Sequence, residues 1–201
     1  MSRNGTIYVV DDDPEICGLI ELIISATPTL DYTVISFSSA EAFLAAYDDG
    51  GTDARCLLLD VRLPGIGGPE LQQRLRDSGA IVPVIILTGY AEVGLAVRTV
   101  KSGALNVLQK PVPRAVLLNQ IAEALAYDAR HRAQRESTKQ RNDQLESLTP
   151  REREVLDLIL EGQNTKEIAT RLGIGLQTVA KHRARALKKL GAKSPLDVAR
   201  R

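Results

Sequence analysis

Five short aliphatic runs alternate with helix-like stretches over the first 128 residues of the chain. Valine, isoleucine and leucine dominate each run, a composition typical of strands buried on both faces. The runs are residues 6–10, 32–37, 56–59, 82–87 and 105–108. Their alternation with helical patterns predicts an α/β domain that is built on a five-stranded parallel sheet, with helices on both faces.

Helix-start signals follow these runs. Asp13 before Pro14 is an N-cap with proline in the first turn. Ser38 and Glu41 have the spacing of a capping box, in which each side chain accepts a hydrogen bond from the other residue's backbone N–H. The remaining helices of this half are expected over 68–79, over 91–102 and from Pro113 onward.

Two stretches of different character complete the chain. Residues 129–147 are highly polar and lack proline, glycine and an apolar repeat, which predicts a solvated linker that is at least partly helical. Residues 148–201 carry cap signals at Thr149 and Asn164 and a glycine turn at 173–175, a pattern typical of a helix-turn-helix domain. The apolar side of its first helix is expected to comprise Val155, Leu156, Leu158, Ile159 and Leu160.

Charge divides unevenly between the two halves. Residues 1–128 contain nine Lys and Arg against sixteen Asp and Glu, a net charge of −7. Residues 129–201 contain seventeen against nine, a net charge of +8. A basic module of this kind favours nucleic acid as its partner, although two halves that simply attract each other would give the same split.

Three absences narrow the class of protein. No apolar run approaches the ~18 residues of a membrane-spanning helix. No signal-peptide pattern follows Met1. Two cysteines, Cys17 and Cys56, are too few for a disulfide framework or a cysteine-based zinc site. We therefore expect a reduced, cytoplasmic protein with no membrane partner.

Chemically distinctive side chains stand at the carboxyl ends of four predicted strands, where parallel sheets bind their ligands. They are Asp11 and Asp12 after the first run, Asp60 after the third, Thr88 after the fourth and Lys110 after the fifth. Crowded carboxylates repel one another, and a hard cation such as Mg²⁺ relieves that repulsion. One carboxylate can then act as the nucleophile toward a phosphoryl group, whose charge the metal and Lys110 neutralise.

Each of these residues alone has a structural explanation. An aspartate after a strand is usually an N-cap or turn residue, as Asp13 is before Pro14. The combination of these residue types at the ends of four strands is what indicates phosphoryl chemistry. An aspartyl-phosphate hydrolase that acts on small phosphoesters uses similar groups, but the helix-turn-helix and the lack of an inserted substrate-specificity cap argue against such an enzyme.

Residues 1–128 resemble the receiver domain of bacterial two-component response regulators. The matching stretches are Val-Val-Asp-Asp-Asp at 9–13, Leu-Leu-Leu-Asp-Val-Arg-Leu-Pro-Gly-Ile-Gly-Gly at 57–68, Ile-Ile-Leu-Thr-Gly at 85–89 and Gln-Lys-Pro at 109–111. The resemblance implies a doubly wound sheet with the strand order 2-1-3-4-5. It also implies that the bond between Lys110 and Pro111 is cis, as it often is in this family.

The same resemblance implies a role for each site residue. Asp60 accepts a phosphoryl group from a sensor histidine kinase, and the only catalysis expected of the domain is its own phosphorylation and dephosphorylation. Mg²⁺ is bound by Asp11, Asp12, Asp60 and the backbone carbonyl of Arg62. Thr88 and Lys110 contact the phosphoryl group.

One position departs from the receiver pattern. An aromatic residue usually stands three positions before the lysine and swings inward when the threonine moves, but this chain has Val107 there. Valine is small and stiff at χ1, so no aromatic rotamer switch is available. Tyr90 or shifts of whole helices are alternative routes for the signal, and Val107 is expected mainly to cover the hydrophobic sheet.

A basic segment lies within the predicted helix-turn-helix. Residues three and four apart share a helix face, so Lys181, Arg185, Lys188 and Lys189 are expected to form a basic stripe while Val179, Ala186, Leu187 and Leu190 face the core. A recognition helix in the major groove of DNA needs this arrangement. The candidate DNA-binding residues are Thr178, Ala180, Lys181, His182, Arg183, Arg185, Lys188 and Lys189.

Residues 148–201 resemble the LuxR/FixJ/NarL-type helix-turn-helix. The matching stretches are Leu-Thr-Pro-Arg-Glu-Arg-Glu-Val-Leu at 148–156, Lys-Glu-Ile-Ala at 166–169 and Thr-Val-Ala-Lys-His at 178–182. The resemblance implies base contacts from the start of the recognition helix. The family usually has lysine where this chain has Ala180, so its target sequence is expected to differ from the family norm.

Together these features predict a phosphorylation-dependent, DNA-binding transcriptional regulator. The phosphorylated form is expected to be a homodimer that uses residues 91–102, the last strand and the helix from Pro113. RNA polymerase is a further candidate partner. The alternative is a regulator that works without phosphorylation, in which the acidic site is structural or controlled by a partner protein.

Overall fold

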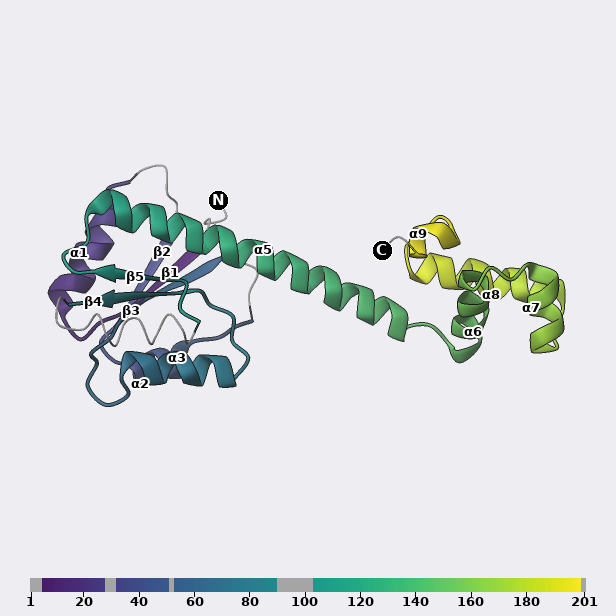
Figure 1. Cartoon of the computed structure of the whole chain (residues 1–201), viewed down its shortest axis with the longest axis horizontal. Helices are drawn as coiled ribbons and strands as arrows, with labels where there is room; N and C mark the ends of the chain where they lie inside the picture. The colour runs from purple at the N-terminus through teal and green to yellow at the C-terminus, as the bar shows by residue number, and fades with distance from the viewer. Residues whose placement is uncertain (1–4, 28–31, 51–52, 90–102, 200–201) are drawn as a thin grey trace. The chain divides into compact units, whose positions relative to one another are not determined.

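The first half of the chain folds around a five-stranded sheet, seen in a computed structural model that describes residues 5–27, 32–50, 53–89 and 103–199. The strands are β1 (Gly5–Val10), β2 (Tyr32–Phe37), β3 (Arg55–Asp60), β4 (Val84–Thr88) and β5 (Asn106–Gln109). All neighbouring strands are parallel, and their order is β2-β1-β3-β4-β5 (Figure 1). Both the predicted α/β class and the predicted strand order are confirmed.

Helices cover both faces of this sheet. Alpha-helices α1 (Pro14–Ser25) and α5 (Arg114–Glu146) lie on one face, and α2 (Ala40–Ala46) and α3 (Gly68–Asp77) lie on the other (Figure 1). Side chains alternate along each strand, so Leu58 of β3 packs toward α1 and α5 while Leu57 and Leu59 pack toward α2 and α3. The helix expected over 91–102 lies outside the described residues.

The caps of these helices differ in one case from the prediction. Asp13 is the N-cap of α1, as predicted, and accepts from the backbone N–H of Glu15. The prediction of a capping box formed by Ser38 and Glu41 was wrong. The N-cap of α2 is Ser39, whose hydroxyl accepts a hydrogen bond from the N–H of Ala42 at 3.2 Å. The register of a cap depends on where the preceding strand ends, and here the helix begins one residue later. The Glu41 carboxylate is therefore available for another contact.

Buried charged groups join the start of β3 to α5. Asp128 of α5 is fully buried, and its Oδ2 accepts hydrogen bonds from the backbone N–H of Arg55 at 2.8 Å and from Nε of Arg132 at 2.6 Å. Arg132 also donates to Oδ1 of Asp49 at 2.9 Å. The other oxygen of Asp128, Oδ1, is buried and has no hydrogen-bond partner among the described residues. We call these four residues the α5 clamp.

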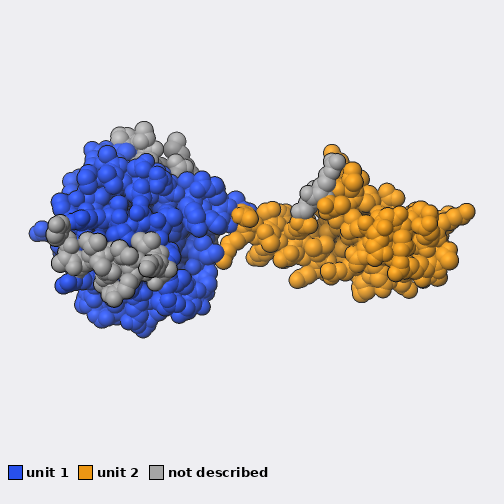
Figure 2. All heavy atoms as spheres, in the orientation of Figure 1, with its two compact units in different colours: residues 1–133 blue, residues 134–201 orange. Residues whose placement is uncertain are grey.

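Helix α5 has 33 residues and includes 129–146, all but the last residue of the polar linker predicted over 129–147, which was expected to be at least partly helical. The chain divides into two compact units, residues 1–133 and 134–201 (Figure 2). The α5 clamp therefore belongs to the first unit. Among the helices that the structure describes, none has the length and apolarity that crossing a membrane requires.

The second unit is a small helical bundle. Its helices are the end of α5 followed by α6 (Pro150–Leu160), α7 (Thr165–Leu172), α8 (Leu176–Lys189) and α9 (Pro195–Ala199). Both predicted capping boxes form, with Thr149 and Glu152 at α6 and Asn164 and Glu167 at α7. Gly173, at a φ of 65°, ends α7 in the left-handed conformation that glycine adopts without strain.

The core of this bundle matches most of the predicted apolar positions. Val155, Leu158, Ile168 and Val179 form one buried cluster, and Leu148, Leu156, Ala186 and Leu190 form another. Leu160 was wrongly placed on the apolar side, because it is 43% exposed. It is the last residue of α6.

Candidate functional site

The carboxyl ends of the parallel strands bring distant residues together at one edge of the sheet. Asp11 follows β1 directly, Asp60 is the last residue of β3, and Thr88 is the last residue of β4. Lys110 follows β5, and its backbone N–H donates to the Thr88 carbonyl at 2.8 Å. The bond from Lys110 to Pro111 is cis, as the resemblance implied.

Lys110 bridges the two buried carboxylates of this edge. Its Nζ lies 2.6 Å from Oδ2 of Asp11 and also hydrogen-bonds Oδ1 of Asp60. The remaining oxygen of Asp60, Oδ2, accepts from the backbone N–H of Arg62 at 2.6 Å. Asp11 and Asp60 are 2% and 7% exposed. The single ammonium charge therefore offsets part of the repulsion between two carboxylates in a partly desolvated site.

These contacts set the protonation behaviour of the pair. Burial raises the pKa of Asp60 above its ordinary value, and the hydrogen bond from Lys110 opposes that rise without cancelling it. Burial alone would lower the pKa of Lys110, but its hydrogen bonds to Asp11 and Asp60 outweigh burial, so the pKa is raised. Lys110 consequently keeps its positive charge at neutral pH.

Asp12 and Thr88 complete the edge in different ways. Asp12 is exposed and lines a surface hollow with Asp11 and Cys17. Thr88 is 2% exposed, and its hydroxyl donates to the carbonyl of Gly89 at 3.2 Å. Among the described residues, no three His, Cys, Asp or Glu side chains gather closely enough to hold a metal by themselves. The donors are nevertheless of the oxygen type that Mg²⁺ prefers, and Mg²⁺ keeps several waters when few protein ligands are present.

The position that departs from the receiver pattern is part of the core. Val107, on β5, is half-buried and packs against the cluster between the sheet and the α2–α3 layer. It has no ring to rotate. Tyr90, the predicted alternative route for the signal, lies outside the described residues.

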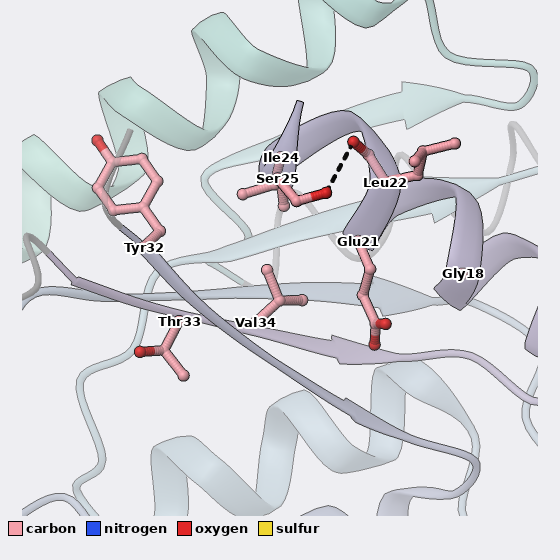
Figure 3. A pocket seen from close by; sticks show the side chains of 8 residues that line it. All are labelled: Gly18, Glu21, Leu22, Ile24, Ser25, Tyr32, Thr33 and Val34. Carbon is pink, nitrogen blue, oxygen red and sulfur yellow. Dashed lines mark hydrogen bonds between the residues drawn. The ribbon is translucent and has the colours of Figure 1, made fainter. Parts of the chain in front are cut away.

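A second hollow in the first unit has a different character. It measures about 580 Å³ and lies between α1 and the edge strand β2 (Figure 3). Its lining is Gly18, Glu21, Leu22, Ile24, Ser25, Tyr32, Thr33 and Val34. Among the described residues of its lining, Glu21 is the only charged side chain.

Helix α8 carries the candidate DNA-binding residues on two different sides. Lys181, Arg185 and Lys188 are exposed at spacings of four and three residues, and they share one face. Val179 and Ala186 are buried on the opposite face, as predicted. Three more candidates, Thr178, Ala180 and Arg183, are exposed, and His182 is half-buried.

Lys189 does not join the basic face. Its Nζ donates to Oε2 of Glu152 at 2.7 Å and to the carbonyl of Ser147 at 2.8 Å. The Lys189 hydrogen bond, followed by the Thr149 N–H, lowers the pKa of Glu152 to about 2. Lys189 thus links α8 to the start of α6. The sequence shows only that it is a basic residue, which fits this role and DNA contact equally well.

Comparison with known proteins identifies both units. Residues 7–122 match the family described as response regulator receiver domain, and residues 146–201 match the family described as bacterial regulatory proteins, luxR family. The transcriptional regulatory protein TdiR of Thauera aromatica is 37% identical over 96% of this chain and 83% of its own length. FixJ of Azorhizobium caulinodans is 33% identical over 100% of this chain and 92% of its own length.

Solved structures agree with this assignment. The solved structure of the response regulator StyR aligns with 100% of this chain and over 100% of its own length, at a TM-score of 0.91 and 32% identity. Full-length FixJ from B. japonicum covers 99% of this chain and 96% of its own at a TM-score of 0.60 and 31% identity. The fold and the site together define a two-component response regulator. The chain belongs to the family that joins a receiver domain to a LuxR-type DNA-binding domain, and it is a transcriptional regulator.

Proposed function

We propose that this regulator is switched by transfer of a phosphoryl group to Asp60 from a sensor histidine kinase. One observation carries the proposal, the bridge from Lys110 to the carboxylates of Asp60 and Asp11. A carboxylate oxygen of Asp60 attacks the phosphorus atom, the bond from phosphorus to the imidazole nitrogen breaks, and the leaving histidine takes up a proton. Lys110 stays charged and offsets the negative charge of the transferred group.

The other residues of the edge hold the reacting groups. We propose that Asp11, Asp12, Asp60 and the backbone carbonyl of Arg62 bind Mg²⁺, which supplies additional positive charge at the phosphoryl oxygens when bound. The Thr88 hydroxyl can exchange its bond to Gly89 for one to a phosphoryl oxygen. Attack of water on the acyl phosphate reverses the modification and releases inorganic phosphate, so the domain catalyses its own dephosphorylation.

A phosphoryl analogue tests the proposal directly. We expect beryllofluoride with Mg²⁺ to raise the affinity of the full chain for its DNA about five- to 150-fold, the usual range of coupling between two sites. Asp60→Asn removes the nucleophile and should abolish the response while leaving basal DNA binding in place. An analytical-ultracentrifugation run on the same samples tests the expected homodimer. DNA affinity that is equal with and without the analogue would favour a regulator that works without phosphorylation.

We further propose that the exposed face of α8 enters the major groove of DNA. Thr178 and Ala180 stand near the helix start, where base contacts are expected. The charged residues supply phosphate contacts, which position the protein and give affinity. A dimer would present two such helices to half-sites about one helical turn apart. RNA polymerase is the partner through which DNA binding would affect transcription.

Charge substitutions on the two sides of α8 should separate DNA contact from bundle stability. We expect Lys181→Ala and Arg185→Ala each to reduce the slope of log affinity against log salt by about one, the value for one phosphate contact. Lys189→Met should leave that slope unchanged and instead lower the stability of the second unit. Equal slopes for the wild type and all three variants would contradict the placement of α8.

The Lys189 contact also has a pH signature. The pKa of Glu152 is depressed in the folded protein from an ordinary value of 4.5 to about 2. The stabilisation is therefore complete above the ordinary pKa and declines as the pH falls toward the folded one. We expect the loss in Lys189→Met to be largest near neutral pH and to shrink below pH 4, as measured by urea unfolding followed by circular dichroism.

A further inference from the structure

The loop between β3 and α3 spans residues 61–67, follows Asp60 directly and is held by several hydrogen bonds. Its first amide, the N–H of Val61, donates to the carbonyl of Leu87 in β4 at 3.2 Å, and the next one, the N–H of Arg62, donates to the Asp60 carboxylate at 2.6 Å. Near its end, the N–H of Gly68 donates to the carbonyl of Val61 at 3.2 Å. A further contact comes from the helix layer, because the N–H of Ile66 donates to Oε1 of Glu41, in the first turn of α2, at 3.0 Å.

The backbone of this loop is shaped to receive the Glu41 carboxylate. Gly65, with a φ of +73°, stands immediately before the donating amide. A Cβ atom at Gly65 would lie 2.5 Å from Oε1 of Glu41, so a side chain at this position would collide with the carboxylate. The glycine thus serves two purposes, since it supplies the left-handed backbone and leaves room for an acceptor from α2.

The chemistry of Glu41 suits this contact. The backbone N–H of Glu41 itself, followed by that of Ile66, holds the pKa of the carboxyl group below its ordinary value, so the group is ionised at neutral pH. A hydrogen bond from an amide to an ionised acceptor is stronger than one between neutral groups. Ser39 fixes the start of α2, so the carboxylate extends from the first turn of a capped helix.

We propose that Glu41 is a positioning residue for the phosphoacceptor site. It tethers the loop over residues 62–66, and so fixes the backbone at Arg62, whose carbonyl is one of the proposed Mg²⁺ ligands. This inference rests on the proposed function of Asp60. It adds Glu41, which lies outside the acidic edge, to the residues on which the site depends. The site would be preorganised by α2 on one side as well as by the strand ends beneath it.

Three single variants of the full chain test the tether. Glu41→Ala removes the acceptor, while Glu41→Gln removes the charge but keeps an amide oxygen that can accept from Ile66. Glu70→Ala is the matched control, because Glu70 is an exposed carboxylate in the first turn of α3 that pairs with Arg74 and not with the loop. Circular dichroism melting confirms that each variant is folded.

Three measurements report on the tether and on the Mg²⁺ site. Amide hydrogen exchange at Ile66 follows the tether without any added ligand. Calorimetric titration with Mg²⁺ alone, and the Mg²⁺ concentration that gives half-maximal phosphorylation by acetyl phosphate, follow the site. We expect Glu41→Ala to speed exchange at Ile66 and to weaken Mg²⁺ binding about three- to tenfold, the effect of losing one hydrogen bond. The phosphorylation rate at saturating Mg²⁺ should be nearly unchanged, because the nucleophile and Lys110 remain.

The variants should rank in a fixed order. Glu41→Gln should weaken Mg²⁺ binding less than Glu41→Ala does, because its amide oxygen still accepts a weaker, neutral hydrogen bond, and Glu70→Ala should match wild type in every measurement. Wild-type Mg²⁺ affinity in Glu41→Ala would overturn the inference, as would equal weakening in Glu41→Gln, which would indicate a long-range charge effect. If the wild type neither binds Mg²⁺ nor accepts a phosphoryl group, the proposed function fails, and exchange at Ile66 still decides whether the tether exists.

Discussion

Arg132→Met should lower the unfolding free energy of the first unit by about 3 kcal/mol, because it leaves the fully buried Asp128 carboxylate without its counter-ion. The remaining donor in the α5 clamp, the N–H of Arg55, contacts the same oxygen. Urea unfolding followed by tyrosine fluorescence measures the change. All five tyrosines of the chain lie within residues 1–133, and the chain has no tryptophan, so the signal reports this unit specifically.

Two further variants show whether the clamp causes this loss. Arg130→Met removes an exposed arginine two residues earlier on α5 and should cost under about 0.5 kcal/mol. Asp128→Asn with Arg132→Met removes both charges and should recover part of the stability, since the asparagine oxygen can still accept from Arg55. Equal losses in Arg132→Met and Arg130→Met would contradict the account of the clamp.

Gly68→Ala should damage both stability and phosphoryl transfer, because a Cβ at Gly68 would lie 2.3 Å from the carbonyl oxygen of Asp60. The backbone at Asp60 or at residue 68 must therefore move. Overpacking of this kind costs typically about 1–3 kcal/mol, and part of it is offset by the better helix propensity of alanine. We expect a net loss near 2 kcal/mol by urea unfolding and slower labelling by radioactive acetyl phosphate, since the displaced residue is the phosphoacceptor.

The neighbouring glycine supplies the control. A Cβ at Gly67 would meet its nearest atoms at 3.9 Å, which is ordinary van der Waals contact. Gly67 is the N-cap of α3, so Gly67→Ala should cost less than about 1 kcal/mol through weaker capping and should leave labelling unchanged. A Gly68→Ala variant that is as stable and as readily labelled as Gly67→Ala would refute the close approach.

Local pattern was sufficient for most of the fold. The central strand β3 was predicted from an unbroken aliphatic run, because a strand that is buried on both faces leaves no polar position in its sequence. The helix starts at Asp13, Thr149 and Asn164 were predicted from capping residues whose partners lie two or three positions away. The start of α2 was misplaced by one residue, because Ser38 and Ser39 are both good caps and the end of β2 selects between them.

Contacts between distant segments could not be predicted in the same way. The pairing of Asp128 with Arg132 has the i, i+4 spacing of a helix, but the approach of Arg55 and Asp49 depends on how α5 packs on the sheet. The capping-box spacing at Glu41 suggested only local partners, but its carboxylate also accepts from the N–H of Ile66, 25 residues away. Basic residues on α8 look alike in the sequence, and only the packing of α6 beside α8 separates Lys189 from the exposed face.

The sequence by itself determined the two-domain organisation, the parallel sheet and the identity of the residues at the strand ends, because these follow from short-range periodicity and from motifs that are contiguous in the chain. The strand order came from the resemblance to receiver domains. The tertiary structure alone decided which charges are neutralised and by which partners. Asp11, Asp60 and Lys110 are separated by up to 99 positions, and the hydrogen bonds among them exist only because parallel strands end at one edge. At that edge burial raises the pKa of Asp60, while the hydrogen bonds to Asp11 and Asp60 outweigh burial and raise the pKa of Lys110.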